Sequence, residues 1–171
     1  MIIRPETAAD HDAIRKVNDE AFGGTLEGKL VDAIRASDRF VPEMSLVAVS
    51  EGLTVGHVIS SYVDVEPGAR RVLQVGPLAV LPSHQRRGIG SALMEETIRI
   101  ADDRAEPLLL IEGSPKYYER FGFARADTVG VEPPAEAHGP QYFMIRQLAT
   151  YDPEFRGRAI YPPETFGSAL L

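Results

Sequence analysis

Apolar positions in the first part of the chain follow a helical period. Residues 2–4 form a short apolar start, and Thr7 with Asp10 three residues later is typical of a helix N-terminus. Apolar residues then recur every three or four positions until Gly23-Gly24, a strong helix breaker. A second short helix is indicated by the apolar face of residues 30–35. We therefore expect a strand followed by two helices.

The period changes to that of strands from Met44 onward. Met44–Ser50 and Thr54–Val63 are rich in β-branched residues and flank Glu51-Gly52, which predicts a β-hairpin. Val72–Val80 is a third apolar run, interrupted by Gly76-Pro77. Because proline cannot donate to a strand ladder, this interruption predicts a bulge, an edge or separated neighbouring strands.

The second half of the chain alternates between helix and strand patterns. Residues 91–103 form an amphipathic helix, and Leu108–Ile111 is a continuous apolar run typical of a strand covered on both faces, our candidate for the sheet centre. Lys116–Arg120 is a short helix at most, Val131–Pro140 is loop, and Tyr142–Leu148 is a late strand. The order is that of a mixed α/β (α+β) sheet.

The overall composition narrows the class of protein. The 171 residues fit a single domain, residues 1–171, in which residues 142–171 form a C-terminal strand and extension. A formal charge of −7 argues against nucleic-acid or anionic-membrane partners, and the absence of cysteine excludes a thiol nucleophile or thiolate metal site. The start lacks the features of a signal peptide and no run is long enough to span a membrane, so we expect a cytoplasmic protein.

The most informative segment is the loop Gln85–Gly90 between an apolar strand and a helix. The first turn of a helix carries N–H groups without intrahelical partners, and glycine at 88 and 90 allows an anion to approach that backbone closely. Arg86 and Arg87 add positive charge, so a diphosphate suits the loop. A nucleotide-triphosphatase loop needs a Lys-Ser or Lys-Thr pair, which the chain lacks, and a dinucleotide fingerprint needs glycine where Leu93 stands. Loop geometry without a ligand remains an alternative.

The loop and its surroundings resemble a known family. Gln85–Gly90 matches Gln/Arg-x-x-Gly-x-Gly/Ala, the coenzyme-A pyrophosphate motif of the GCN5-related N-acetyltransferases (GNAT). Val75–Val80 looks like their central strand, and Tyr117–Phe123 looks like their Tyr-Tyr-x-Arg-Phe-Gly-Phe segment. Tyr142–Phe166, with Tyr161-Pro162-Pro163, is similar to a small bacterial subgroup of predicted acetyltransferases. The resemblance implies a mixed sheet with splayed middle strands, flanked by helices.

The resemblance also implies a reaction and a set of cofactor-binding residues. The protein would transfer the acetyl group of acetyl-CoA directly to a primary amine of a small molecule or protein, with no metal. The free backbone of the splayed strand would pair with the pantetheine arm, and the loop amides with the Ser91 hydroxyl would hold the pyrophosphate. The implied cofactor-binding residues are Leu78, Ala79, Val80, Gln85, Arg86, Arg87, Gly88, Ile89, Gly90 and Ser91.

Two residues are candidates for proton transfer. Tyr118 matches the tyrosine that serves as general acid in many family members, although Tyr117 takes its place if the register shifts by one. Glu112, at the end of an apolar strand, is the candidate general base. His57, which shares a strand face with Val55 and Ile59, is a weaker candidate that we expect to point into the acceptor-side cleft of the sheet. A water chain is an alternative to either base. The four histidines show no metal-ligand spacing.

The acceptor side carries the weakest pattern. We expect the acceptor pocket between the first helices, the Glu66–Arg71 loop and the Val131–Pro140 segment. An edge strand near Tyr142 would allow a homodimer. Two functional alternatives stay open: a catalytically weak acyl-CoA-binding or regulatory module, and an interaction domain in which the glycines only form turns.

Overall fold

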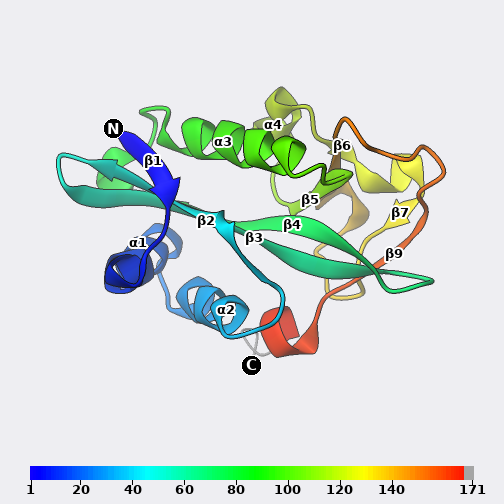
Figure 1. Ribbon diagram of the computed structural model, residues 1–171, viewed down its shortest axis with the longest axis horizontal. Coiled ribbons are helices and arrows are strands. Elements are labelled where there is room, and N and C mark those ends of the chain that lie inside the picture. The colour runs from blue at the N-terminus through cyan, green and yellow to red at the C-terminus, as the bar shows by residue number, and fades with distance from the viewer. Residues whose placement is uncertain (168–171) are drawn as a thin grey trace.

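A computed structural model of the protein describes residues 1–167 and shows a nine-stranded mixed sheet with helices on both faces (Figure 1). The strands are β1 (Ile2–Pro5), β2 (Phe40–Ser50), β3 (Leu53–Glu66), β4 (Arg70–Val80), β5 (Leu108–Glu112), β6 (Ala124–Arg125), β7 (Val131–Glu132), β8 (Phe143–Gln147) and β9 (Gly157–Ile160). The helices are α1 (His11–Phe22), α2 (Leu26–Arg35), α3 (Ile89–Asp103) and α4 (Pro115–Tyr118), with the short turns η1 (Ala8–Asp10), η2 (Pro82–His84), η3 (Glu119–Phe121), η4 (Ala126–Val129), η5 (Pro140–Tyr142) and η6 (Pro163–Gly167).

The main path of the sheet is β1-β2-β3-β4-β5-β8-β6, and β9 pairs with β3 and β7. The strands from β1 to β4 are antiparallel neighbours, whereas β4 and β5 are parallel and are connected through α3. The hairpin expected at Glu51-Gly52 is confirmed, and both turn residues have the positive φ angles, 52° and 79°, that a tight hairpin requires. The predicted mixed α/β (α+β) sheet flanked by helices is therefore confirmed.

The first helical segment begins and ends where the sequence indicates. The carboxylate of Asp10 accepts hydrogen bonds from the backbone N–H and the hydroxyl of Thr7, at 2.7 and 2.9 Å, so the predicted start signal is present. Helix α1 ends at Phe22 because Gly23 adopts a left-handed conformation, with a φ of 72°. In this conformation the N–H of Gly23 donates a hydrogen bond to the carbonyl of Asp19. This cap turns the chain into α2.

Helices pack on both faces of the sheet (Figure 1). On one face, α3 packs through Leu93 and Met94 against β2, β3 and β4. On the other face lie α1, α2 and the turn η6, and Ile14 of α1 packs with Val31 and Ile34 of α2. A separate cluster of buried residues, including Phe143, fills the end of the sheet near β8 and β9. The two faces together enclose the strand ends at which the site lies.

The C-terminal part differs from the expectation in one respect. Strand β8 pairs with β5 on one side and with Ala124–Arg125 of β6 on the other, so the edge strand expected near Tyr142 is wrong. The extension from β8 continues through β9, which was not expected, to η6, where Glu164 lies 3.2 Å from Arg39. The predicted extension, residues 142–171, includes residues 168–171, which lie outside the described part of the chain. Within residues 1–167, none of the helices combines the length and apolarity that crossing a membrane requires.

Candidate functional site

Strands β4 and β5 separate in the middle of the sheet. They pair in parallel from Leu73 opposite Leu109 to Val75 opposite Ile111, and the pairing ends there. The next residues of β4 are Gly76-Pro77, where the pairing with β3 also shifts register. Proline lacks the N–H that a ladder needs, which accounts for the interruption. The splayed middle strands expected from the sequence are confirmed.

Beyond this interruption, one edge of β4 is not paired with β5 and faces the gap between the two strands. The N–H of Leu81 donates to the carbonyl of Val55 on β3, at 2.9 Å. Since backbone groups alternate sides along a strand, Ala79 also directs its groups toward β3, whereas Leu78 and Val80 direct theirs into the gap. The carbonyl of Val80 accepts a hydrogen bond from the side-chain amide of Gln85, at 3.0 Å. Gln85 therefore ties the loop to the free edge of β4.

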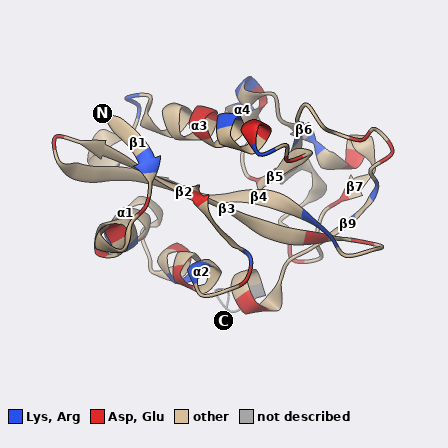
Figure 2. Cartoon of the chain, in the orientation of Figure 1, with Lys and Arg blue, Asp and Glu red and all other residues tan. Residues whose placement is uncertain are grey.

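The loop before α3 has the backbone of an anion site. Arg86 and Gly88 both adopt left-handed conformations, with φ angles of 60° and 81°, and α3 begins at Ile89. A β-carbon added to Gly88 would have no atom within 4 Å, so it would project into open space beside the loop. The first-turn N–H groups of α3 have no intrahelical acceptor, and the positive end of the helix dipole lies here. This loop is one of the basic segments in Figure 2.

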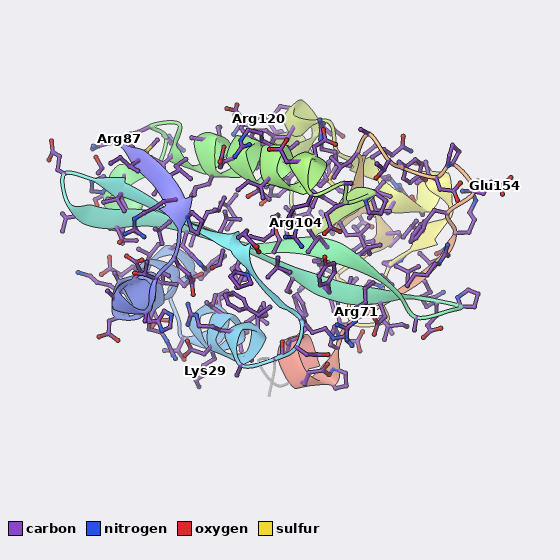
Figure 3. All side chains as sticks on the ribbon, viewed as in Figure 1. Lys29, Arg71, Arg87, Arg104, Arg120 and Glu154 are labelled. Atoms are coloured by element: carbon purple, nitrogen blue, oxygen red, sulfur yellow. The ribbon has the colours of Figure 1, made fainter. Side chains whose placement is uncertain are left out.

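A basic cavity of about 590 Å³ lies beside this loop. Its lining is Leu78, Val80, His84, Gln85, Arg86, Gly88, Ile89, Gly90, Ser91, Tyr117, Tyr118 and Arg120. None of these described lining residues is acidic. The cavity thus has the charge and the backbone donors that a diphosphate needs. Of the residues expected around the cofactor, Ala79 and Arg87 are absent from the lining: the Ala79 side chain is buried, and Arg87 is exposed (Figure 3).

Arg120 is a member of the basic cavity that the sequence analysis missed. Its guanidinium lies 4.2 Å from the ring centroid of Tyr117 and donates to the hydroxyl of Ser91, at 3.1 Å. In Figure 3 it lies above α3, on the same side of the sheet as the loop. Its position three residues after Tyr117, one helical turn away, is the signal that places it beside this ring.

Tyr117 and Tyr118 line both this cavity and a second one. Their rings meet edge to face, with centroids 4.9 Å apart. The hydroxyl of Tyr117 lies over Gly90, where an added β-carbon would come within 2.7 Å of it. The Tyr118 ring packs against Phe123, and burial followed by the neighbouring Tyr117 raises the pKa of Tyr118 to about 12. Tyr118 therefore keeps its proton at neutral pH.

The second cavity, which we call the apolar cavity, has a volume of about 720 Å³ and lies on the other side of the two tyrosines. Its lining includes Phe22, Leu26, Glu27, Leu30, Gln74, Val75, Gly76, Pro77, Leu78, Ile111, Glu112, Gly113, Ser114, Glu136, His138, Tyr142, Tyr161 and Phe166. The first helices and the 131–140 segment contribute, as expected for the acceptor side, but the Glu66–Arg71 loop does not. Tyr161 and Phe166 come from the C-terminal extension, whose part in this cavity the sequence did not reveal.

Glu112 lies at the end of β5 in the apolar cavity and has three hydrogen-bond donors. The backbone N–H and the Nδ1 of His138 lie 2.8 and 2.6 Å from its Oε1, and the hydroxyl of Tyr161 donates to its Oε2 at 2.8 Å. The structure thus brings Glu112 and Tyr118 to the same cavity, although they come from different elements. Their role in chemistry depends on what the cavity binds.

His57 does not reach either cavity. It is fully buried and faces α1, where its Nδ1 lies 3.2 Å from the amide nitrogen of Asn18 and its Nε2 lies 3.0 Å from the hydroxyl of Ser45. The expectation that it points into the acceptor-side cleft is wrong, because this face of β3 is covered by α1. Within residues 1–167, no group of three or more potential ligand side chains is arranged to hold a metal ion.

Comparison with known proteins bears directly on these two cavities. A family model described as the acetyltransferase (GNAT) domain matches residues 2–126. The uncharacterized N-acetyltransferase YjhQ of Escherichia coli K12 is 31% identical over 117 residues, which cover 67% of this chain and 65% of YjhQ. The chain therefore spans slightly less than two thirds of that relative. The uncharacterized N-acetyltransferase YhbS of the same strain is 32% identical over 127 residues, 74% of this chain and 75% of YhbS.

Solved structures agree with this match. The crystal structure of YhbS from Escherichia coli in complex with CoA superposes with a TM-score of 0.87 and 25% identity, over 95% of this chain and 90% of that one. A GNAT family acetyltransferase from Brucella melitensis in complex with acetyl-CoA gives a TM-score of 0.78 and 28% identity, over 95% and 96% of the two chains. With the splayed β4 and the basic loop before α3, these matches show that the chain belongs to the GNAT family of acetyl-CoA-dependent acetyltransferases.

Proposed function

We propose that the protein is an N-acetyltransferase that transfers the acetyl group of acetyl-CoA directly to a primary amine. Acetyl-CoA supplies the acetyl group as a thioester; one N–C bond forms, the C–S bond breaks, and coenzyme A leaves as the thiol. The observation that carries the proposal is the meeting of the basic and apolar cavities at Leu78, Tyr117 and Tyr118. Two substrates can thus approach each other from opposite sides of these residues.

The basic cavity supplies the groups for holding the cofactor. The backbone amides of Arg86 to Gly90, which include those of Arg87 and Ile89, receive the pyrophosphate together with the Ser91 hydroxyl. The carbonyl of Leu78 and the N–H of Val80, which face the gap, pair with the pantetheine arm as an added strand. Gln85 acts through the strand, because its amide is already bound to the carbonyl of Val80.

Tyr118 and the backbone of β4 serve the thioester end. As the C–S bond breaks, Tyr118 donates its proton to the sulfur, and its pKa of about 12 keeps that proton available at neutral pH. The N–H of Leu78, directed into the gap, meets the carbonyl oxygen while negative charge develops on it. The phenolate of Tyr118 then regains a proton from solvent.

Glu112 serves the amine end. Its carboxylate lies in the apolar cavity, held by His138 and Tyr161, and it accepts the proton that the amine nitrogen loses. The proton passes directly or through one water. Glu112 then releases this proton to solvent, which balances the proton that Tyr118 takes up after protonating the sulfur.

Two measurements test the proposal in sequence. Acetyl-CoA at 100 times its dissociation constant stabilises the folded protein by about 2.7 kcal/mol, which a thermal melt detects. Release of free thiol from acetyl-CoA is then measured across a panel of primary amines, including alkylamines, arylalkylamines, L-amino acids and lysine peptides. If acetyl-CoA binds but none of the amines causes thiol release, the protein is a cofactor-binding module instead. If millimolar acetyl-CoA causes no thermal shift, both functions are contradicted.

Gly88→Asp is the matched test of the cofactor site. The carboxylate would project into the open space beside the loop and repel the pyrophosphate, so we expect acetyl-CoA binding to be lost. Gly52→Asp is the control, because Gly52 has a similar left-handed conformation, with a φ of 79° and open space around its β-carbon, but lies in the β2–β3 hairpin. Equal loss of binding in both variants contradicts the assignment of the loop.

A further inference from the structure

The two cavities carry opposite charge on their described lining residues. The basic cavity has Arg86 and Arg120 and no carboxylate. The apolar cavity has Glu27, Glu112 and Glu136 and neither Lys nor Arg; its one basic side chain is that of a histidine. A ligand of the apolar cavity therefore meets an acidic field, and any carboxylate that it carries finds no permanent cation there.

A buried hydrogen-bond chain at the base of the apolar cavity ends in an unused acceptor. The hydroxyl of Tyr161 must donate to Glu112, since a carboxylate oxygen only accepts, and it therefore accepts from the Nε2 of Gln74, at 2.8 Å. This order fixes the orientation of the Gln74 amide. Its Oε1 is buried without a hydrogen-bond partner, and the residue is 2% exposed.

A buried acceptor without a partner lowers the stability of the folded protein unless a ligand or a water molecule donates a hydrogen bond to it. Gln74 and Glu112 both line the apolar cavity and are linked through the hydroxyl of Tyr161, and the carboxylate of Glu112 already has three donors. Two carboxylate oxygens have about four acceptor positions, which leaves one more for a ligand. Together they leave two acceptor positions for an incoming N–H group, the Oε1 of Gln74 and one position on Glu112, beside the second N–H of the Gln74 amide. An amine nitrogen can donate to both acceptors.

The walls of the same cavity are apolar and largely aromatic. Helices α1 and α2 contribute Phe22, Leu26 and Leu30. The C-terminal extension contributes Tyr161 and Phe166, whose rings stack with centroids 4.6 Å apart and planes 16° apart. This stacked pair adds aromatic surface to the lining, against which another ring or a branched alkyl chain packs favourably.

We propose that the acceptor is a primary amine on an apolar, aromatic body that bears no carboxylate. This inference rests on the proposed acetyl transfer and names the class of acceptor for it. The amine nitrogen donates to Glu112 and Gln74, and the apolar body packs against Tyr161 and Phe166. A carboxylate next to the amine would be placed among the glutamates and lose its hydration without gaining a cation.

Three amines of matched shape test this class. 2-Phenylethylamine has the body and no carboxylate, L-phenylalanine adds the carboxylate, and L-phenylalaninamide adds an uncharged group of similar size. Because the three amines differ in their neutral fraction at a given pH, kcat/KM is calculated from the concentration of the neutral amine. We expect it to be at least about tenfold higher for 2-phenylethylamine and the amide than for L-phenylalanine. If L-phenylalanine is used as well as 2-phenylethylamine or better, the inference is overturned. It is also overturned if both L-phenylalanine and the amide are used poorly, because the size of the added group and not its charge would then determine selectivity.

A charge variant makes the same test within the protein. Glu136→Lys places a cation at the exposed rim of the apolar cavity and should raise the use of L-phenylalanine relative to 2-phenylethylamine by about tenfold. Glu154→Lys is the control, since this exposed residue lies at the end of the molecule farthest from Arg87 in Figure 3. An equal change in both variants, or none in Glu136→Lys, contradicts the inference.

Binding separates this inference from the proposed function. Titration calorimetry measures the three amines against the protein saturated with coenzyme A. Binding in the expected order without thiol release from acetyl-CoA contradicts the acetyl transfer and supports the acceptor site. Turnover of L-phenylalanine as fast as 2-phenylethylamine contradicts the inference and supports the transfer. Absence of binding by all three amines contradicts the inference.

Discussion

The hydroxyl of Tyr117 occupies the space beside Gly90 in which any other residue would carry its β-carbon. The two groups come from the loop-to-α3 junction and from α4, which are otherwise joined here through Arg120 and Ser91. A single missing methyl group therefore allows α4 to approach the first turn of α3. This contact fixes one wall of the basic cavity.

Gly90→Ala tests that contact. The new methyl group would lie 2.7 Å from the Tyr117 hydroxyl, so the ring must move and the basic cavity must change shape. We expect acetyl-CoA affinity, measured by calorimetry, to fall by about tenfold or more. Gly24→Ala is the control, because a β-carbon there meets nothing within 4 Å and Gly24 lies outside both cavities.

The double variant Gly90→Ala/Tyr117→Phe identifies the cause. Removing the hydroxyl leaves the ring carbon that bore it 3.9 Å from the new methyl group, which is an ordinary contact. We expect the double variant to recover most of the affinity lost in Gly90→Ala. If it binds as weakly as the single variant, the contact with Tyr117 is not what requires glycine.

Tyr118→Phe tests the general acid. We expect kcat to fall by roughly 10²- to 10⁴-fold while the dissociation constant of acetyl-CoA stays the same, because the substitution removes the proton-donating hydroxyl and keeps the ring. Because the pKa of Tyr118 is about 12, its deprotonation should not reduce the rate at any pH up to about 11. Tyr117→Phe is the comparison: if it loses turnover and Tyr118→Phe does not, the two tyrosines exchange roles.

Arg120→Met tests the cation that the sequence analysis missed. The variant keeps an unbranched apolar stem over the Tyr117 ring but loses the charge and the hydrogen bond to Ser91. We expect a weaker affinity for acetyl-CoA and a smaller dependence of that affinity on salt, measured by calorimetry between 50 and about 500 mM salt. Arg99→Met removes an exposed charge from α3 outside both cavities and should change neither quantity.

Acid stability should depend on a buried network around Glu6, which follows β1 and contacts side chains of α2, β2 and β3. Burial opposes ionisation of Glu6, but hydrogen bonds from His57, Arg35 and Ser45 outweigh it and lower its pKa to about 2. Burial also lowers the pKa of His57, which is held neutral in the folded protein. Asn18 donates to its Nδ1, so the ring hydrogen lies on Nε2.

Both shifts act in the same direction on stability. The unfolded chain binds a proton at His57 near pH 6.5 and at Glu6 near pH 4.3, whereas the folded protein binds them only at lower pH. The free energy of unfolding should therefore fall as pH decreases below about 6.5, and fall further between about 4.3 and 2. Urea denaturation from pH 3 to pH 8 measures this.

Glu6→Gln should remove the Glu6 part of that dependence. We expect the variant to be less stable than the wild type at pH 7 and the difference to shrink as pH approaches 3. Glu95→Gln is the control, because Glu95 is exposed on α3, and its difference from the wild type should stay small at every pH. A constant difference for Glu6→Gln would show that this carboxylate does not carry the acid dependence.

Local sequence signals predicted several turns and breaks of the fold, among them the loop that lines the basic cavity. The loop 85–90, the hairpin at Glu51-Gly52 and the break at Gly76-Pro77 are each short segments whose glycine, proline or periodicity acts on neighbouring residues. Tyr117 and Tyr118 follow each other in sequence and both line the two cavities. An error of one residue in the predicted register would therefore still have selected a tyrosine that lines them.

The apolar cavity depends on contacts that no local pattern encodes. Gln74 and Tyr161 are 87 positions apart in the chain, and Glu112 joins them through its own hydrogen bond. Strand β9 has only four residues, too few for a strong alternation, and it forms because it pairs with the end of β3. The position of His57 was predicted wrongly for the same reason, since α1 covers that face of β3 only in the folded chain.

The part played by Tyr161 and Phe166 has a consequence for how the two cavities are completed. The basic cavity draws only on residues between Leu78 and Arg120, whereas the apolar cavity needs both the first helices and the last described turn. Tyr161 and Phe166 of the C-terminal extension therefore line the apolar cavity and not the basic one. If the proposed acetyl transfer holds, exchanging the extension between relatives should redirect the choice of amine while acetyl-CoA binding is retained.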